Sequence, residues 1–139
     1  MKQLTFVLFL LAFTVNTAMA QSGPVMTFEK TEIDYGTVAL GGDGVRIFKF
    51  KNTGTQPLVI KNARGSCGCT VPKWPNEAIQ PGKTATIEVK YDTSRSGAFT
   101  KDVYVETNET QPKHTLTIKG TVVDKNITGS TATGSGSKR

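Results

Sequence analysis

The sequence is poor in the residues that most enzymes use for catalysis. It holds one histidine, one tryptophan and two cysteines in 139 residues, and its acidic residues are dispersed along the chain. It contains no nucleophile elbow, no phosphate-binding glycine loop and no HExxH motif. The histidine, His114, stands at the start of a predicted strand, where a surface position is the simplest interpretation. The sequence therefore favours a protein that is not an enzyme.

The chain also lacks helical periodicity. Between residues 26 and 123, no stretch repeats its apolar residues about every 3.6 positions, and apolar and polar residues alternate instead. The alternation predicts strands over residues 26–28, 33–38, 45–51, 58–61, 84–91, 98–107 and 114–123. Turn signals about every ten residues are typical of an all-β protein, an antiparallel sandwich or barrel of seven or eight strands.

One face of these strands supplies enough large apolar side chains for the core of a single domain. The predicted core residues are Phe28, Ile33, Phe48, Phe50, Leu58, Ile60, Ile87, Val89, Phe99, Val103, Val105, Leu116, Ile118 and Val122.

The N-terminal residues 1–20 predict a secretory signal peptide. Lys2 precedes an apolar run, and Ala18 and Ala20 are small residues at the two positions that a signal peptidase reads. Cleavage is expected after Ala20. The apolar run is too short to span about 30 Å of hydrocarbon, so no membrane-spanning segment is expected. The protein is therefore expected to be exported, to the periplasm or the extracellular space.

The rest of the chain divides into a domain and a tail. Residues 21–123 suit one β-sandwich domain, and residues 124–139, rich in glycine, serine and threonine, predict a disordered tail. Removing Lys2 with the signal peptide lowers the formal charge from +6 to +5. The basic residues are scattered singly on alternating positions, which argues against a nucleic-acid partner.

Both cysteines lie in one short motif, Cys67-Gly68-Cys69, which is the candidate thiol or metal site. The supporting residues of the same loop are Gly65, Ser66, Thr70, Pro72 and Trp74. In an oxidising compartment the two thiols could pair with none left over.

Three interpretations of this motif remain open, and the structural one is narrowly favoured. In the first, both cysteines are small hydrophobes buried beneath Trp74. In the second, they form a disulfide suited to thiol exchange, although Cα atoms two apart in an extended strand, about 6.5–7 Å, lie at the edge of disulfide geometry. Gly68 would then supply the backbone freedom to close the ring. In the third, Cys67 and Cys69 bind Cu(I), a soft ion that two thiolates suit; zinc would need more ligands.

With these motifs in view, the chain resembles the exported bacterial family called domain of unknown function 1573. The resemblance rests on the motifs Asp34-Tyr35-Gly36-Thr37-Val38, Phe48-Lys49-Phe50-Lys51-Asn52-Thr53-Gly54, Ser66-Cys67-Gly68-Cys69-Thr70, Ile79-Gln80-Pro81-Gly82 and Gly97-Ala98-Phe99-Thr100-Lys101. It implies an immunoglobulin-like sandwich, akin to cilia-associated, major-sperm-type and pilus-chaperone domains. It implies no established activity.

The sequence therefore predicts an exported, non-enzymatic immunoglobulin-like domain that acts as an envelope-associated binding or scaffold module. Its partner would be another envelope protein, with no cofactor required. The alternative is a Cu(I)-binding or thiol–disulfide protein that uses Cys67 and Cys69.

Overall fold

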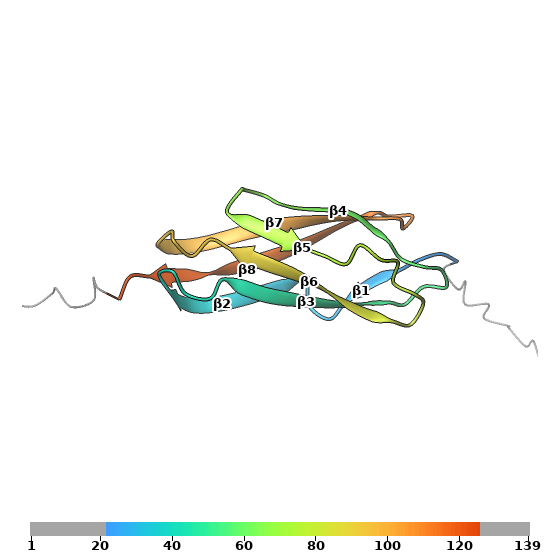
Figure 1. Ribbon diagram of the computed structural model, residues 1–139, viewed down its shortest axis with the longest axis horizontal. Helices are drawn as coiled ribbons and strands as arrows, with labels where there is room; N and C mark the ends of the chain where they lie inside the picture. The colour runs from blue at the N-terminus through green and yellow to red at the C-terminus, as the bar shows by residue number, and fades with distance from the viewer. Residues whose placement is uncertain (1–21, 126–139) are drawn as a thin grey trace, which may run out of the picture.

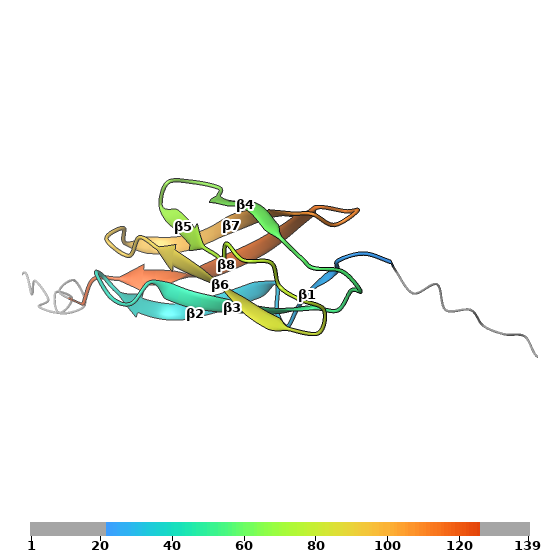
Figure 2. The same cartoon turned by 45° about the vertical axis from the view of Figure 1, so that its right-hand side comes forward.

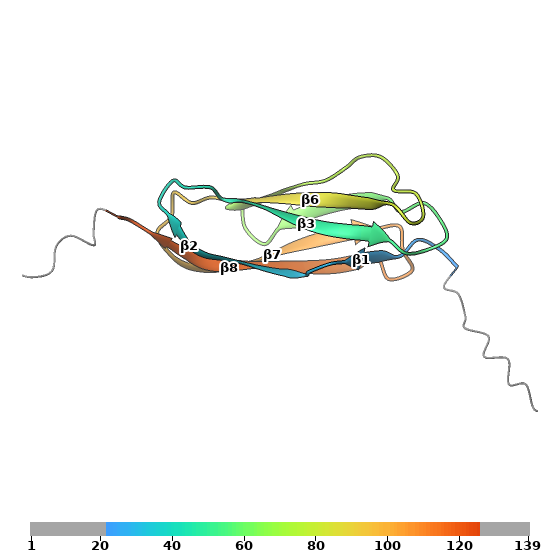
Figure 3. The ribbon, with the colours of Figure 1, turned by 90° about the horizontal axis from the view of Figure 1, so that it is seen from below.

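The computed structural model describes residues 22–125, in which eight strands form two four-stranded sheets. The predicted signal peptide and the predicted tail beyond residue 125 lie outside the described residues. The strands run along the long axis of the domain (Figure 1). Seen from below, β3 and β6 lie in one layer and β2, β7 and β8 in the other (Figure 3).

The first sheet, sheet A, is antiparallel throughout. Its strands lie in the order β1 (Met26–Phe28), β3 (Val45–Asn52), β6 (Thr84–Tyr91) and β5 (Thr70–Lys73). The predicted alternation is visible in β3, where the phenylalanines are buried and the lysines between them are exposed. Sheet A therefore keeps one face in the core and one in solvent.

The second sheet, sheet B, contains one parallel pair. Its strands lie in the order β2 (Glu32–Ala39), β8 (Lys113–Val123), β7 (Gly97–Thr107) and β4 (Ile60–Gly65). Strand β2 pairs with β8 in parallel, and the other pairings are antiparallel. Strands β1 and β2 follow each other along the long axis, so the chain passes from sheet A to sheet B without reversing. Strand β2 then runs in the same direction as β8 (Figure 1). The predicted all-β sandwich is confirmed, with this one parallel pairing added.

The core lies where the alternation placed it. All the predicted core residues are buried except Phe28 and Ile33, which are half-buried and pack against the core. No helix among residues 22–125 is long and apolar enough to cross a membrane.

One end of the core is closed by aromatic rings. The rings of Tyr91 and Phe99 stack with centroids 3.8 Å apart, and Tyr35 meets Phe99 edge to face. The Tyr35 hydroxyl donates to the carbonyl oxygen of Gly44 at 3.0 Å. The Arg46 guanidinium lies over the Tyr35 ring, 4.2 Å from its centre. Burial raises the pKa of Tyr35 to about 12, because the charged phenolate would lose its water.

The predicted turn after β3 is organised by a fully buried asparagine, Asn52. Its amide nitrogen donates to the carbonyl oxygens of Gln56 and Ile79, each at 2.8 Å. Its amide oxygen accepts from the backbone nitrogens of Val25 and Gly54. Because both ends of the side chain amide are satisfied, this polar group is stable in the interior.

Strand β5 was missed by the sequence pattern, which shows a loop there. Its proline, Pro72, is tolerated because β5 is an edge strand. The Asp92 backbone nitrogen donates to the carbonyl oxygen of Cys69 at 2.8 Å. Because every second residue of an antiparallel strand bonds to the same neighbour, the backbone groups of residues 69, 71 and 73 are the ones that hydrogen-bond to β6. The nitrogen of Pro72 therefore faces the free edge, where no donor is needed.

Candidate functional site

The cysteine motif lies in one of the turns that pass from one sheet to the other. Strand β4, at the edge of sheet B, ends at Gly65, and β5, at the edge of sheet A, begins at Thr70. The turn between them is visible as the green loop that leads from β4 to β5 (Figure 2). Both cysteines therefore lie on the side of the sandwich where two edge strands meet.

Backbone hydrogen bonds tie this turn to both sheets. On the sheet B side, the Ser66 nitrogen donates to the Asp102 carbonyl oxygen at 2.8 Å, and the Asp102 nitrogen donates to the Ser66 hydroxyl at 3.2 Å. On the sheet A side, Asp92 donates to the carbonyl oxygen of Cys69. The supporting role expected for Ser66 is thus to hold the turn against β7.

The structure joins Cys67 and Cys69 in a disulfide, so they are not the two separate buried thiols of the narrowly favoured interpretation. Their Cα atoms are 5.2 Å apart, inside the usual disulfide range rather than at its edge. The shortening comes from a tight turn, in which the Thr70 nitrogen donates to the Cys67 carbonyl oxygen at 3.2 Å. The estimate from an extended strand was wrong because the segment bends.

The two sulfur atoms lie in different surroundings. Cys69 is 7% exposed and belongs to the core, whereas Cys67 is only partly buried and packs against the core. The hydroxyl oxygen of Thr70 lies 3.7 Å from the sulfur of Cys67 and 3.8 Å from that of Cys69. Thr70 itself is 2% exposed, so its hydroxyl is held beside the pair inside the domain.

Of the two glycines of the cysteine turn, the fold requires Gly65 rather than Gly68. Gly68 is exposed, has no positive φ, and a Cβ there would meet no atom within 4 Å, so the turn does not need glycine at this position. At Gly65 a Cβ would lie on the carbonyl oxygen of Thr70, 2.9 Å from the Thr70 Cβ and 3.0 Å from the Cys67 carbonyl oxygen. The close approach of β4 to β5 therefore requires Gly65.

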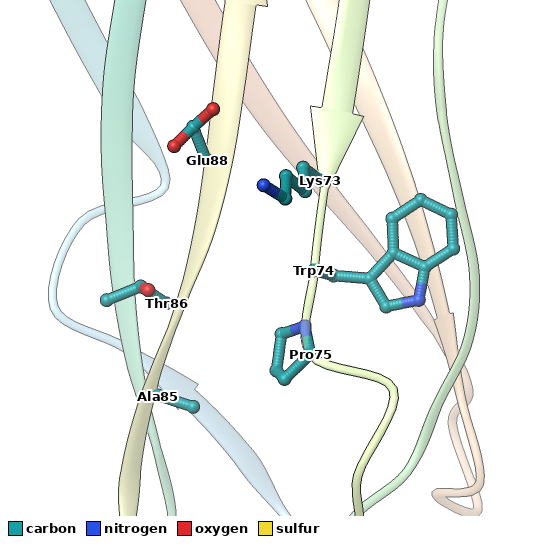
Figure 4. A pocket seen from close by; sticks show the side chains of 6 residues that line it. All are labelled: Lys73, Trp74, Pro75, Ala85, Thr86 and Glu88. Carbon is teal, nitrogen blue, oxygen red and sulfur yellow. The ribbon is translucent and has the colours of Figure 1, made fainter.

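Trp74 belongs to a cleft rather than to a cover over the sulfur atoms. The cleft has a volume of about 370 Å³. It lies between β6 and the segment that follows the end of β5, where this segment diverges from β6 (Figure 4). Its lining residues are Lys73, Trp74, Pro75, Ala85, Thr86 and Glu88. The side chain of Lys73 extends toward β6, whereas the half-buried indole points away from β6 (Figure 4).

The capacity of the turn to hold a metal ion depends on its two sulfur atoms. No group of three or more histidine, cysteine or acidic side chains suited to a metal occurs within the described part of the chain. The nearby polar side chain is the Thr70 hydroxyl, which is a poor ligand for a soft ion. A Cu(I) site would therefore be a two-sulfur site, and it would exist only after reduction of the disulfide.

His114, taken from sequence as a surface residue, is held in a structural contact. Its Nε2 atom lies 2.6 Å from a carboxylate oxygen of Glu109, and its ring meets the edge of Phe28. The same carboxylate accepts from the Met26 nitrogen and from the Thr107 hydroxyl, each at 2.7 Å. This network ties the short strand β1 to the hairpin between β7 and β8. Sequence reasoning missed it because β1 lies more than 80 residues from Glu109 along the chain.

Solved structures similar to this fold are immunoglobulin-like domains. The chain resembles a Porphyromonas gingivalis protein of unknown function, with a TM-score of 0.64 and 17% identity over 78% of this chain; it spans about half, 51%, of that protein. It resembles a PapD-like domain of human CEP192, with a TM-score of 0.54 and 13% identity over 71% of this chain and 85% of that one. It also resembles the CsuC–CsuE chaperone–adhesin complex of Acinetobacter baumannii, with a TM-score of 0.50 and 10% identity over 73% of this chain and 57% of that one.

At these identities the likeness establishes the fold alone. No curated protein matches the sequence. One family model does match, over residues 26–122, which covers the whole sandwich except the last residue of β8 and includes the whole cysteine turn. The chain therefore belongs to the family described as Protein of unknown function (DUF1573).

Proposed function

We propose that this protein is an exported, non-enzymatic binding module that docks another envelope protein on the outer face of sheet A. The observation that carries the proposal is a pair of large apolar side chains exposed on that face. Val71 on β5 is 59% exposed, and Ile47 on β3 is 47% exposed. Apolar side chains gathered on one exposed face mark interaction sites, and these two lie on the same face of sheet A, on either side of β6.

The two side chains belong to one continuous surface. In the sheet A register, Val71 is level with Lys90, and Ile47 is level with Glu88 and Lys73. The cleft that Trp74 lines opens at the end of the same strand β5. Lys73, Thr86 and Glu88 line that cleft, so it adjoins the outward positions of β5 and β6, and a polar rim of this kind commonly surrounds an apolar centre.

The charge of this face indicates the chemistry of the partner. Strands β3, β5 and β6 direct Lys49, Lys51, Lys73 and Lys90 outward, and Glu88 is the one acidic residue among the outward positions of these strands. A surface of this kind attracts acidic partners and speeds their association. The partner would therefore present acidic side chains around an apolar centre.

Export is the second part of the proposal. It is supported by the order of Lys2, an apolar run and small residues at Ala18 and Ala20. Mass spectrometry of the protein recovered from the exporting cell tests it. The expected N-terminus is Gln21, and an intact N-terminus at Met1 in the cytoplasmic fraction would contradict export.

A photo-crosslinking residue at Val71 tests the docking surface in the exporting cell. We expect a discrete crosslinked product with one partner at Val71. The same residue at Thr100, an exposed position on the other sheet, is the matched control and should give no such product. Equal products at the two positions, or none at Val71, would contradict the proposal.

Charge reversal adds an independent measurement. Lys73→Glu should lower the crosslinked yield at Val71 about tenfold, because it places a like charge opposite an acidic partner. Lys61→Glu, on β4 in the other sheet, makes the same change of net charge and should leave the yield unaltered. A yield that responds equally to both would mean that only net charge matters.

The Cu(I) alternative keeps the same two sulfur atoms and applies to the reduced pair. Two thiolates suit a soft monovalent ion. Copper titration of the reduced protein tests it, with one Cu(I) expected per pair and none in the Cys67→Ser, Cys69→Ser double variant. Equal binding by the two proteins would exclude the site.

A further inference from the structure

The Cys67–Cys69 disulfide contributes little as a structural cross-link. A disulfide stabilises a fold mainly by restricting the unfolded chain, and the effect grows with the number of residues in the loop. Here one residue, Gly68, lies between the cysteines. Hydrogen bonds to Asp102 and Asp92 already tie the turn to both sheets. The bond therefore adds little constraint that the turn lacks.

The disulfide is open to attack on one side. Thiol–disulfide exchange needs a sulfur atom that an incoming thiolate can reach. Cys67 is partly exposed, and the neighbouring Gly68 is exposed with no atom within 4 Å of the position of a Cβ. Cys69 is 7% exposed. Cys67 is therefore the more accessible of the two cysteines to an incoming thiolate.

The buried sulfur has a partner that favours its departure as a thiolate. The Thr70 hydroxyl oxygen lies 3.8 Å from the Cys69 sulfur and 3.7 Å from the Cys67 sulfur, and Thr70 is 2% exposed, so it can donate to whichever sulfur leaves. A hydroxyl that donates to a thiolate stabilises the charged form and makes it a better leaving group. This hydroxyl is held beside the sulfur by the fold before any reaction begins.

From these three observations we infer that the Cys67–Cys69 pair exchanges its disulfide with dithiols of other exported proteins. Cys67 is the sulfur that is attacked, Cys69 is the leaving sulfur, and the Thr70 hydroxyl donates a hydrogen bond to it as it leaves. The exchange is a separate activity from the proposed docking on sheet A. The two are neighbours, because Val71 follows Cys69 by two residues.

The exchange balances in two steps. A thiolate of the partner bonds to the Cys67 sulfur, and the sulfur–sulfur bond breaks. Its electron pair goes to Cys69, which takes a proton from water. The second thiolate of the partner then attacks the partner sulfur in the mixed disulfide and releases Cys67 as a thiolate. The partner dithiol loses two electrons and becomes a disulfide, and the Cys67–Cys69 disulfide gains them and becomes two thiols.

A dithiol peptide tests the activity on the wild-type chain from Gln21 onward. The oxidised protein is mixed with an equimolar ten-residue peptide that carries two cysteines, and both masses are followed under native conditions. We expect the peptide to lose about two mass units and the protein to gain about two, in equal amounts. A protein that stays oxidised until urea unfolds it would overturn the inference and leave the disulfide a structural element.

Two single-cysteine variants test which sulfur is attacked. Cys69→Ser leaves Cys67 alone, and Cys67→Ser leaves Cys69 alone. With oxidised glutathione as the probe, the Cys67 thiol should form a mixed disulfide at least tenfold faster than the Cys69 thiol, because Cys69 is buried. Equal rates, or the reverse order, would overturn the assignment. The peptide experiment needs no variant, so it decides the activity even where a variant folds poorly.

The role of Thr70 has its own measurement. Thr70→Val keeps the shape of the side chain and removes the hydroxyl, and it should slow reduction of the wild-type pair by dithiothreitol about fivefold. Thr93→Val removes another buried hydroxyl, which donates to the Gly42 carbonyl oxygen, and should leave the rate within twofold. Equal rates in the two variants would overturn the role given to Thr70.

Discussion

The two glycines of the cysteine turn allow one substitution to be compared at two positions three residues apart. In Gly65→Ala the new Cβ would lie on the backbone carbonyl oxygen of Thr70 and 2.9 Å from the Thr70 Cβ. The neighbour is backbone and cannot rotate away, so the strands must separate. Overpacking of this kind costs about 1–3 kcal/mol, and we take the upper end. Alanine also restricts the unfolded chain, which offsets about 0.4–1 kcal/mol. We expect a net loss of about 2 kcal/mol.

Gly68→Ala is the matched control, because a Cβ there meets nothing within 4 Å and φ is not positive. Its expected effect is between zero and a gain of about 1 kcal/mol, from the unfolded state alone. Urea unfolding of both oxidised variants measures the difference. The fluorescence of Trp74, the single tryptophan, reports the transition.

The result that would refute this reasoning is specific. If Gly65→Ala and Gly68→Ala change the free energy of unfolding equally, then β4 and β5 do not approach as closely as the Cβ distances indicate. If Gly68→Ala alone is harmful, then the turn needs glycine at the position that sequence reasoning chose. Either outcome would place the constraint on the turn rather than on the strand crossing.

Three further predictions concern stability. Asn52→Asp should cost about 2–4 kcal/mol at pH 7, because the introduced carboxylate meets two carbonyl oxygens. Burial raises the pKa of that carboxyl above its unfolded value of about 4, so the loss should shrink as pH falls from 7 and be largely gone by about pH 4; a urea-measured loss independent of pH would contradict it. The pKa of Tyr35 is raised from 10.0 to about 12, so the folded state favours the neutral phenol. The free energy of unfolding should therefore fall as pH rises from about 10 to about 12. An absorbance titration in which all tyrosines ionise near pH 10 would disprove this. Glu109→Ala should cost about 2 kcal/mol and speed amide exchange at Met26, because Glu109 accepts from the Met26 nitrogen and the Thr107 hydroxyl. Glu106→Ala is the control and should change stability by less than about 0.5 kcal/mol. Equal losses would show that the contacts of Glu109 with β1 add nothing to stability.

The fold class was predictable because the alternation of apolar and polar residues has a direct physical cause. A strand with one wet face must place every second residue in the core. Phe48 and Phe50 were therefore placed correctly without any knowledge of their neighbours. Strand β5 was not predicted, because it is short, contains a proline and directly follows a turn motif. Its strand character depends on pairing with β6, which lies beyond the next loop in the chain.

The candidate site was located by sequence and misread in its details. Two cysteines separated by one residue mark the turn, but their pairing depends on a backbone bend that shortens the Cα distance to 5.2 Å. The buried hydroxyl beside both sulfur atoms belongs to Thr70, and nothing in the local sequence distinguishes it from an exposed threonine. Trp74 follows the motif closely in sequence, yet it lines a cleft beside β6.

The sequence by itself determined the all-β class, the core faces of the strands and the position of the cysteine turn, because each depends on local periodicity or on residue type. The tertiary structure decided which strands pair, that β2 runs parallel to β8, that Glu109 contacts β1, and that Cys69 is more deeply buried than Cys67. These features depend on contacts between segments far apart in the chain. Local residue patterns do not reveal them, since the free energy of such contacts arises only when the two sheets have packed.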